Sequence, residues 1–205
     1  MRRRWLALVL PLVTAGCGYN TIQTYDEQAN QAKSQISVQL QRRADLIPNL
    51  VNTVKGYAQH EEEVFTNVAN ARAGLLGAVR SGDPAQMATA NQEMTGALGR
   101  LIAVAEAYPQ LKADQQFQRL MDELSGTENR IAVARKDYND AAQQYNTLIR
   151  RFPTALTAKA IGAKAKPYYE ATAPNAEQAP SVDFSRPTAP ATTTPSARPA
   201  PAKQP

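Results

Sequence analysis

Histidine and cysteine, which many enzymes use for acid–base, nucleophilic or metal chemistry, each occur once in this 205-residue chain. The single histidine, His60, stands three residues after Tyr57, where a di-iron site in a helical bundle would need a glutamate. Val64 follows the glutamates after His60, so the zinc-binding pattern His-Glu-x-x-His is absent too. The single cysteine, Cys17, lies in an N-terminal segment typical of export signals. We therefore expect no catalytic residue, no metal site and no cofactor.

A set of polar side chains is the remaining candidate for a site. Its members recur at helical steps on two expected helices, and we call them the polar seam: Arg42, Asp45, Asn49 and Asn52 on the first, and Glu128, Arg135, Asn139 and Asn146 on the second. Buried together, they would form a hydrogen-bonded ionic network, which specifies helix register more than it adds stability. Two interpretations stay open: register-setting pairs and solvated faces, or a small-molecule or peptide site. We expect Arg135 to be buried against a carboxylate and Arg72 to be exposed.

The elements that position the polar seam follow from the apolar residues. Between residues 117 and 152 these recur at steps of three and four, a 3.5-residue period typical of a long helix packed on other helices. Pro153 ends the pattern. Gly126 lies inside this helix, and we expect it to allow close packing. The stripe is Phe117, Leu120, Leu124, Thr127, Ile131, Ala134, Tyr138, Ala141, Tyr145, Leu148 and Phe152.

Three further helices are expected before this one. The first covers residues 22–57, with a kink at Pro48, which removes one backbone hydrogen bond. The second covers about residues 60–81, and the third begins at Pro84 after the cap Asp83 and ends before Pro109. Asp114 is a suitable cap for the last helix. The sequence therefore predicts an all-α fold, an antiparallel up-and-down four-helix bundle with two long and two shorter helices.

The unequal helix lengths predict a narrower end. The shorter pair leaves part of the longer pair uncovered, so a two-helix stalk is expected on the membrane side. Apolar stripes match across this stalk when the register pairs Ile22 with Leu148, Tyr25 with Tyr145, Ala29 with Ala141, Ala32 with Tyr138, and Ile36 with Ala134.

The positive charge of the chain is concentrated at its start. The formal net charge is +5, but residues 1–17 carry three arginines and no acid, and residues 18–166 carry 17 basic and 15 acidic groups. A nucleic-acid partner is therefore not expected. The three arginines, a short apolar run and then Cys17 resemble a bacterial lipoprotein signal, with Cys17 as the acylated residue. Gly18 follows this cysteine, in place of the aspartate that usually retains lipoproteins in an inner membrane, so the outer membrane is the expected location where the organism has one.

The C-terminal part changes in composition. Residues 154–173 are expected to form a short helix or ordered arm. Residues 174–205 are rich in proline, alanine and threonine and are expected to be disordered, because such a segment cannot bury enough apolar surface. The predicted organisation is a signal in residues 1–17, a bundle in 18–153, this arm, and the tail.

Several blocks of the sequence resemble the LemA family over about residues 20–172. They are RRADLIPNLV (42–51), YPQLKA (108–113), GTENRIAVARKDYN (126–139), YN (145–146), FP (152–153) and KPYYE (166–170). The resemblance implies a membrane-anchored bacterial helical bundle without an established biochemical activity. The chain departs from the family pattern in its lipoprotein-like Cys17 and in its proline-rich tail.

These observations together predict a non-catalytic scaffold or adaptor of the cell envelope. It would be extracytoplasmic, anchored to membrane lipid through its N-terminus, and bound to an unknown envelope protein. The alternatives are a small-molecule or peptide-binding protein, or an enzyme, that uses the polar seam, and a spacer whose tail contacts peptidoglycan or a partner.

Overall fold

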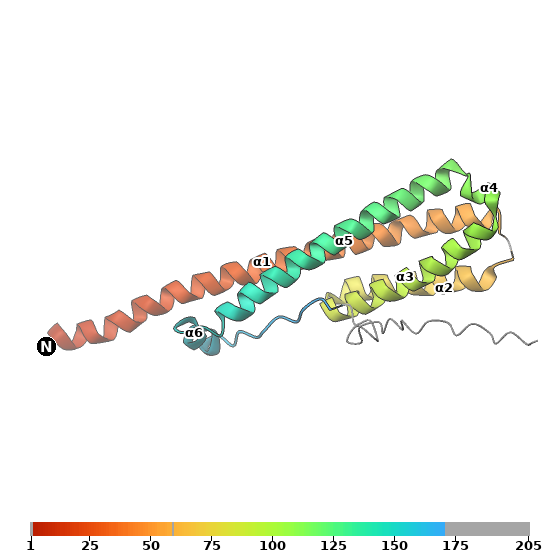
Figure 1. The fold of residues 1–205 in the computed structure, drawn as a ribbon. Coiled ribbons are helices and arrows are strands. Elements are labelled where there is room, and N and C mark those ends of the chain that lie inside the picture. The colour runs from red at the N-terminus through yellow and green to blue at the C-terminus, as the bar shows by residue number, and fades with distance from the viewer. Residues whose placement is uncertain (1, 59, 171–205) are drawn as a thin grey trace, which may run out of the picture. The chain divides into compact units, whose positions relative to one another are not determined.

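The computed structural model describes residues 2–58 and 60–170, and their side chains from Gly18 onward, as an all-α unit without strands (Figure 1). This part of the chain contains the helices α1 Arg2–Lys55, α2 Glu62–Ser81, α3 Pro84–Ala107, α4 Pro109–Lys112, α5 Gln115–Leu148 and α6 Thr154–Ala160. The prediction of an all-α fold is confirmed. The short α4 was not predicted.

Two helix pairs organise this unit. α1 and α5 run antiparallel along each other, and the shorter α2 and α3 form a second pair, in which α2 packs on α1 (Figure 1). The α2–α3 pair lies along the C-terminal part of α1, and α6 packs on α1 nearer its N-terminus. The predicted register places Tyr57 level with residue 113, and the Tyr57 hydroxyl indeed donates a hydrogen bond to the neighbouring Asp114 carboxylate over 3.0 Å.

Apolar side chains at helical spacing form one main core from α1 to α5. Each large aliphatic side chain removed from water contributes about 1.5–3 kcal/mol. The apolar stripes of α1 and α3 supply much of this core: Ile36, Leu40, Ala44, Ile47, Leu50, Val54, Met87, Ala90, Met94, Ala97 and Leu101 are all buried.

The predicted stripe of α5 is right at its start and partly wrong towards its end. The stripe residues from Phe117 to Tyr138 are buried as expected, and so is Tyr145, but Ala142 is buried where Ala141 was predicted, and Phe152 is 83% exposed. A straight helix has 3.6 residues per turn, so a strict 3.5-residue repeat drifts by about 20° in each heptad. After several heptads the buried face has moved to the next residue, and α5 itself ends at Leu148.

The predicted starts of α3 and α5 are confirmed by their caps. Asp83 accepts hydrogen bonds from the N–H groups of Ala85 and Gln86, and Asp114 accepts from those of Gln116 and Phe117. The backbone N–H of Phe117 is the main reason why the pKa of Asp114 lies below its ordinary value.

Two glycines have different roles. Gly82 ends α2 in the left-handed conformation, with φ of 68°, which a residue without a Cβ adopts at little cost. Gly126, in contrast, was expected to allow close packing, and this is wrong: a Cβ added there meets no atom within 4 Å.

The chain after α5 belongs to the folded unit. Tyr169 is 2% exposed and forms part of the main core, and Ala158 of α6 lies in a second small cluster with Ile22 and Tyr145. Residues 163–170 run from α6 back towards α3 (Figure 1). The expected bare two-helix stalk is therefore wrong, because α6 and this C-terminal segment pack on the part of α1 and α5 that α2 and α3 leave uncovered.

Two predictions fall on residues that the structure does not describe. The backbone of Cys17 lies within α1, but its side chain is outside the described ones, as is the tail of residues 174–205. Among the described residues, no helix is both long and apolar enough to cross a membrane.

Pro48 lies inside α1 without ending it, and Figure 1 shows no sharp bend in this helix. Proline has no N–H, so the carbonyl oxygen of Ala44 lacks its normal helical donor. Nε of Arg72, on α2, donates a hydrogen bond to this oxygen over 2.7 Å. Arg72 is therefore half-buried and bonded, and the expectation that it is exposed is wrong. Its guanidinium provides a partner for the carbonyl that the proline leaves free.

This contact predicts a coupling between Arg72 and Pro48. Arg72→Ala should lower the free energy of unfolding by about 1.5–3 kcal/mol, because a buried carbonyl loses a charged donor. In a Pro48→Ala background the same change should cost less than about 1 kcal/mol, because the alanine introduced there supplies the helical N–H. Urea unfolding of the four proteins in this double-mutant cycle measures the difference.

The matched control is Arg80→Ala, which removes an exposed arginine from the same helix and should change stability by no more than about 0.5 kcal/mol. Equal costs of Arg72→Ala with and without Pro48 would show that the two residues act independently.

Candidate functional site

Arg43 is the most deeply buried charged side chain among the described residues, with 4% of its surface exposed. Nη1 donates to Glu128 of α5 and, over 2.6 Å, to Oδ1 of Asn91, while Nη2 donates to Oγ1 of Thr95 over 3.1 Å. Burial lowers the pKa of Arg43, and the negative charge of Glu128 opposes this effect. One guanidinium thus joins α1, α3 and α5.

The predicted polar seam contains Arg42, one residue before Arg43, the arginine that is buried. Arg42, Asp45 and Asn49 are exposed, and Asp45 bonds only to Gln41 of its own helix. At about 100° per residue, Arg43 lies roughly 40° from the buried Ile47, whereas Arg42 lies roughly 140° away. The helical period of the apolar stripe therefore identifies Arg43, which the search for polar neighbours missed.

On α5, the polar seam holds the C-terminal segment. Asn146 donates to the carbonyl oxygen of Lys166 over 2.9 Å and accepts from its backbone N–H over 2.8 Å. Asn139 makes the same two bonds to Tyr169, at 3.1 Å and 2.8 Å. A primary amide carries both a donor and an acceptor, so each asparagine satisfies both backbone groups of one residue.

The spacing of the two asparagines matches the spacing of the residues they hold. Asn139 and Asn146 are seven residues apart, and seven residues of α-helix rise about 10.5 Å. Lys166 and Tyr169 are three residues apart, and three residues of extended chain span about 10 Å. Two turns of α5 are therefore as long as the extended stretch beside them, which explains why both amide pairs form together.

Tyrosine hydroxyls complete the attachment of this segment. Tyr138 donates to the carbonyl oxygen of Pro167 over 2.6 Å, and the buried Tyr169 donates to that of Met87 over 3.2 Å. Burial raises the pKa of each of these two hydroxyls to about 12, so both remain protonated donors at neutral pH.

Arg135 and Lys166 are bound through charge and ring contacts. The guanidinium of Arg135 lies 4.9 Å from the centre of the Tyr169 ring, in cation–π geometry, rather than against the predicted carboxylate. Lys166 reaches α1, where Nζ lies 3.0 Å from the carboxylate of Asp26 and 2.9 Å from Oδ1 of Asn30. The C-terminal segment is thus held to α1, α3 and α5 at once.

The geometry defines what the polar seam does within the chain. Glu128 binds Arg43, and Arg135, Asn139 and Asn146 contact the C-terminal segment. Only the α5 half of the predicted seam is brought together, because Arg42, Asp45, Asn49 and Asn52 of α1 are exposed. No group of three histidine, cysteine or acidic residues able to hold a metal occurs in the part of the chain that is described.

A groove between α1 and α5, with a volume of about 620 Å³, is separate from these contacts. Its lining is rich in glutamine and also contains the exposed Val133 of α5. Oε1 of Gln39, on α1, is buried at the groove and has no hydrogen-bond partner in the described structure. The lining residues are Gln28, Gln31, Ala32, Gln35, Gln39, Asn129, Arg130, Val133, Ala134 and Asp137.

The fold and this seam define an all-helical protein that uses its internal polar groups to fasten its own C-terminal segment. The LemA family matches residues 32–184, and the chain belongs to that family. The resemblance seen in the sequence is thereby confirmed.

Several named relatives agree with this assignment. Magnetosome protein MamQ 2 of Paramagnetospirillum magneticum is 30% identical over 188 residues, covering 80% of this chain and 69% of the relative. Magnetosome protein MamQ of Magnetospirillum gryphiswaldense is 29% identical over 187 residues, with the same coverage. Protein LemA of Metamycoplasma hominis is 24% identical over 143 residues, covering 69% of this chain and 64% of the relative.

The amide pairs predict a strong effect of one isosteric change. Asn146→Asp should lower the free energy of unfolding by about 2–3 kcal/mol, because a carboxylate cannot donate to the Lys166 carbonyl and repels it. The segment should then leave α5 more often, and trypsin should cut faster after the exposed Lys164. Urea unfolding and timed proteolysis measure the two effects.

Asn129→Asp is the matched control, because Asn129 is exposed on the same helix, and it should change stability by less than about 0.5 kcal/mol. If the two variants were equally stable and equally resistant to trypsin, Asn146 would not hold the segment.

Ionisation of the buried tyrosines predicts a loss of stability in alkali. In the folded protein the pKa of Tyr169 and of Tyr138 is about 12, above the ordinary value of 10.0. The unfolded state therefore loses these protons first, and the stabilisation present below about pH 10 falls as the pH rises towards 12. Tyr169→Phe should reduce this fall, measured by urea unfolding at a series of pH values.

Tyr168→Phe changes the neighbouring exposed ring and should leave the pH dependence as it is in the parent protein. An identical alkaline loss in the Tyr169→Phe and Tyr168→Phe proteins would contradict the assignment.

Proposed function

We propose that this LemA-family protein is a non-catalytic scaffold or adaptor of the cell envelope. Its folded unit would act as an up-and-down bundle of α1, α2, α3 and α5, on the extracytoplasmic side of a membrane. The observation that carries the proposal is the use of the polar seam: its asparagines, Asn139 and Asn146, bind the backbone of the chain itself.

Attachment to the membrane is proposed from the N-terminal sequence. Three arginines, an apolar run over residues 5–13 and then Cys17 fit a segment that is exported, cleaved and acylated at the cysteine. Two relatives are named as magnetosome proteins, and these names favour a structural role in a cell compartment over a role as a metabolic enzyme.

The groove between α1 and α5 is the proposed docking surface for an envelope protein. Glutamine amides can donate and accept hydrogen bonds, so this lining suits a polar partner surface. The unpaired Oε1 of Gln39 would gain a donor there, which removes the cost of leaving it buried without a partner. The exposed Val133 adds apolar contact at the same place.

A second candidate function is the binding of an extended peptide by the seam. The observation in its favour is that Asn139 and Asn146 pair with both backbone groups of the residues they hold, which recognises an extended chain by its main chain. In this structure the site is filled by residues 166–169 of the protein itself. An external peptide would have to displace them.

Site-specific photo-crosslinking in cells tests the scaffold proposal. A photoreactive residue in place of Val133, in the groove, should cross-link to one defined envelope protein. The same residue in place of the exposed Ala103 of α3, outside the groove, should not. A Cys17→Ser protein should remain unprocessed and lose acyl labelling.

Seam variants separate the scaffold from the ligand-binding alternative. A Glu128→Gln protein that still folds should keep both the cross-link and the cellular function, since the seam has only an internal role in this proposal. Loss of function with the cross-link intact would favour the peptide or small-molecule alternative. Equal cross-linking at Val133 and Ala103 would contradict the groove as a docking surface.

A further inference from the structure

α6 and its flanks expose large apolar side chains that the folded unit does not cover. Phe152 is 83% exposed, Leu156 65% and Ile161 41%, whereas Ala158 faces the small cluster on α1 and α5. Isolated apolar residues are common on protein surfaces, but several within ten residues of one short element mark a contact surface.

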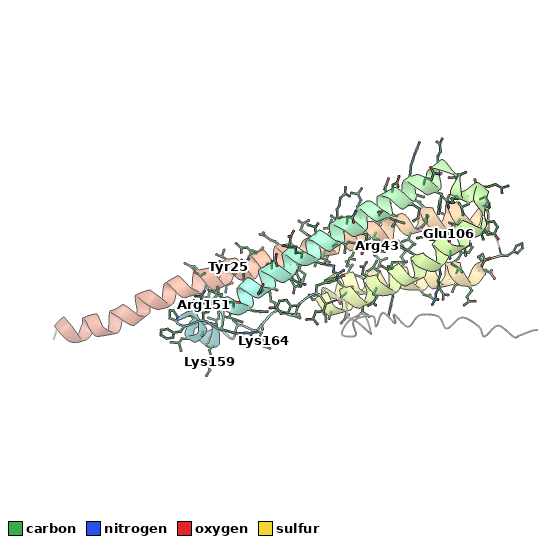
Figure 2. All side chains as sticks on the ribbon, viewed as in Figure 1. Tyr25, Arg43, Glu106, Arg151, Lys159 and Lys164 are labelled. Atoms are coloured by element: carbon green, nitrogen blue, oxygen red, sulfur yellow. The ribbon has the colours of Figure 1, made fainter. Side chains whose placement is uncertain are left out.

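The same stretch is positively charged. Arg150, Arg151, Lys159 and Lys164 are exposed, and residues 141–169 contain no aspartate or glutamate. Figure 2 shows Arg151, Lys159 and Lys164 gathered at the α6 end of the unit. Lys166 is not part of this surface, because its ammonium is bound to Asp26.

A close contact between α6 and α1 places this surface beside Gly18, near the N-terminal end of the folded unit. A Cβ added to Gly18 would lie 3.2 Å from Oγ1 of Thr157 and 3.5 Å from Cγ2 of Thr154, so α6 packs tightly on α1 at this glycine. Gly18 directly follows Cys17. A lipid attached to Cys17 would therefore hold α6 at the level of the membrane surface.

We propose that residues 150–164, which we call the α6 foot, insert into the interface of a membrane that contains anionic phospholipid. The inference rests on the proposed membrane attachment and adds a second contact, with a stated lipid chemistry. Apolar side chains of the foot enter the headgroup and upper acyl region, and the cations pair with lipid phosphates.

The combination of side chains favours a lipid surface over other partners. Lysine and arginine keep their charged ends in water while their methylene stems cover apolar surface, which suits a boundary between headgroups and acyl chains. Exposed apolar residues at the same level would gain nothing from a nucleic acid backbone. A lipid on Cys17 would fix α1 at one point only, so a second contact through α6 would limit the tilt of α1.

The test uses a single thiol label on the full chain. Cys17 is the only cysteine, so a parent protein acylated there and purified from its own membranes has no free thiol and takes up no label. Labelling of the parent protein therefore tests the proposed anchor separately. Leu156→Cys then carries the only reactive thiol. An environment-sensitive dye at this position, in vesicles of phosphatidylcholine with about 30% phosphatidylglycerol, should shift to the blue and be quenched by nitroxides on the acyl chains.

Val133→Cys is the matched control, because Val133 is 61% exposed and Leu156 is 65% exposed. Its dye should remain in water. Replacing both Lys159 and Lys164 by glutamine should lower the partition of the Leu156→Cys dye into the membrane by about 25-fold, at roughly fivefold per charge. Pure phosphatidylcholine vesicles should give the same reduced signal.

Three outcomes would overturn the inference. The first is a dye at position 156 that shows no more blue shift and no more quenching than the dye at position 133, on protein shown to be anchored. This result would exclude membrane insertion of the α6 foot and leave the proposed anchor unaffected. A shift in native membranes but not in protein-free vesicles would identify a protein as the occupant. Label uptake by the parent protein would show a free Cys17 and remove the anchor on which the inference rests.

Discussion

The pairing of two asparagine amides with an extended stretch of backbone supports much of this structure. Asn139 and Asn146 satisfy four main-chain groups that would otherwise lie at the protein surface or be buried without partners. They thereby allow residues 163–170 to cover α1 and α5 where α2 and α3 are too short to reach. The burial of Tyr169 depends on the position of this segment.

Two arginines, the buried Arg43 and the half-buried Arg72, each meet a particular structural need. Arg43 crosses the core and joins three helices, at the cost of burying a charge, which Glu128, Asn91 and Thr95 offset. Arg72 provides a donor for the carbonyl that Pro48 leaves free. Both arginines therefore serve the architecture.

The sequence predicted the helices far better than their polar contacts. Helix periodicity and capping residues such as Asp83 and Asp114 act locally, so the element type and most boundaries could be inferred from neighbouring residues. The burial of Arg43 could also have been found, because it lies on the apolar stripe. The drift that replaced Ala141 by Ala142 needed the helix geometry, since a 3.5-residue repeat and a 3.6-residue helix agree only over a few turns.

The contacts of the C-terminal segment could not be inferred in the same way. Asn139 and Tyr169 are 30 residues apart, and no periodic pattern links a helix to an irregular extended segment. The block KPYYE at residues 166–170 was recognisable as part of a family resemblance, but its partners were not. Lys166 shows the same limit, because its contact with Asn30 spans 136 residues.

The direction of the extended segment sets the place from which the rest of the chain departs. α6 lies beside Gly18, but from Ala163 to Glu170 the chain advances by roughly 3.3 Å per residue, or about 23 Å, towards Met87 at the start of α3. The entry and exit points of the folded unit are therefore separated along its long axis. The segment therefore sets the last described residue, Glu170, roughly 23 Å from Ala163, beside the start of α3 rather than beside α6.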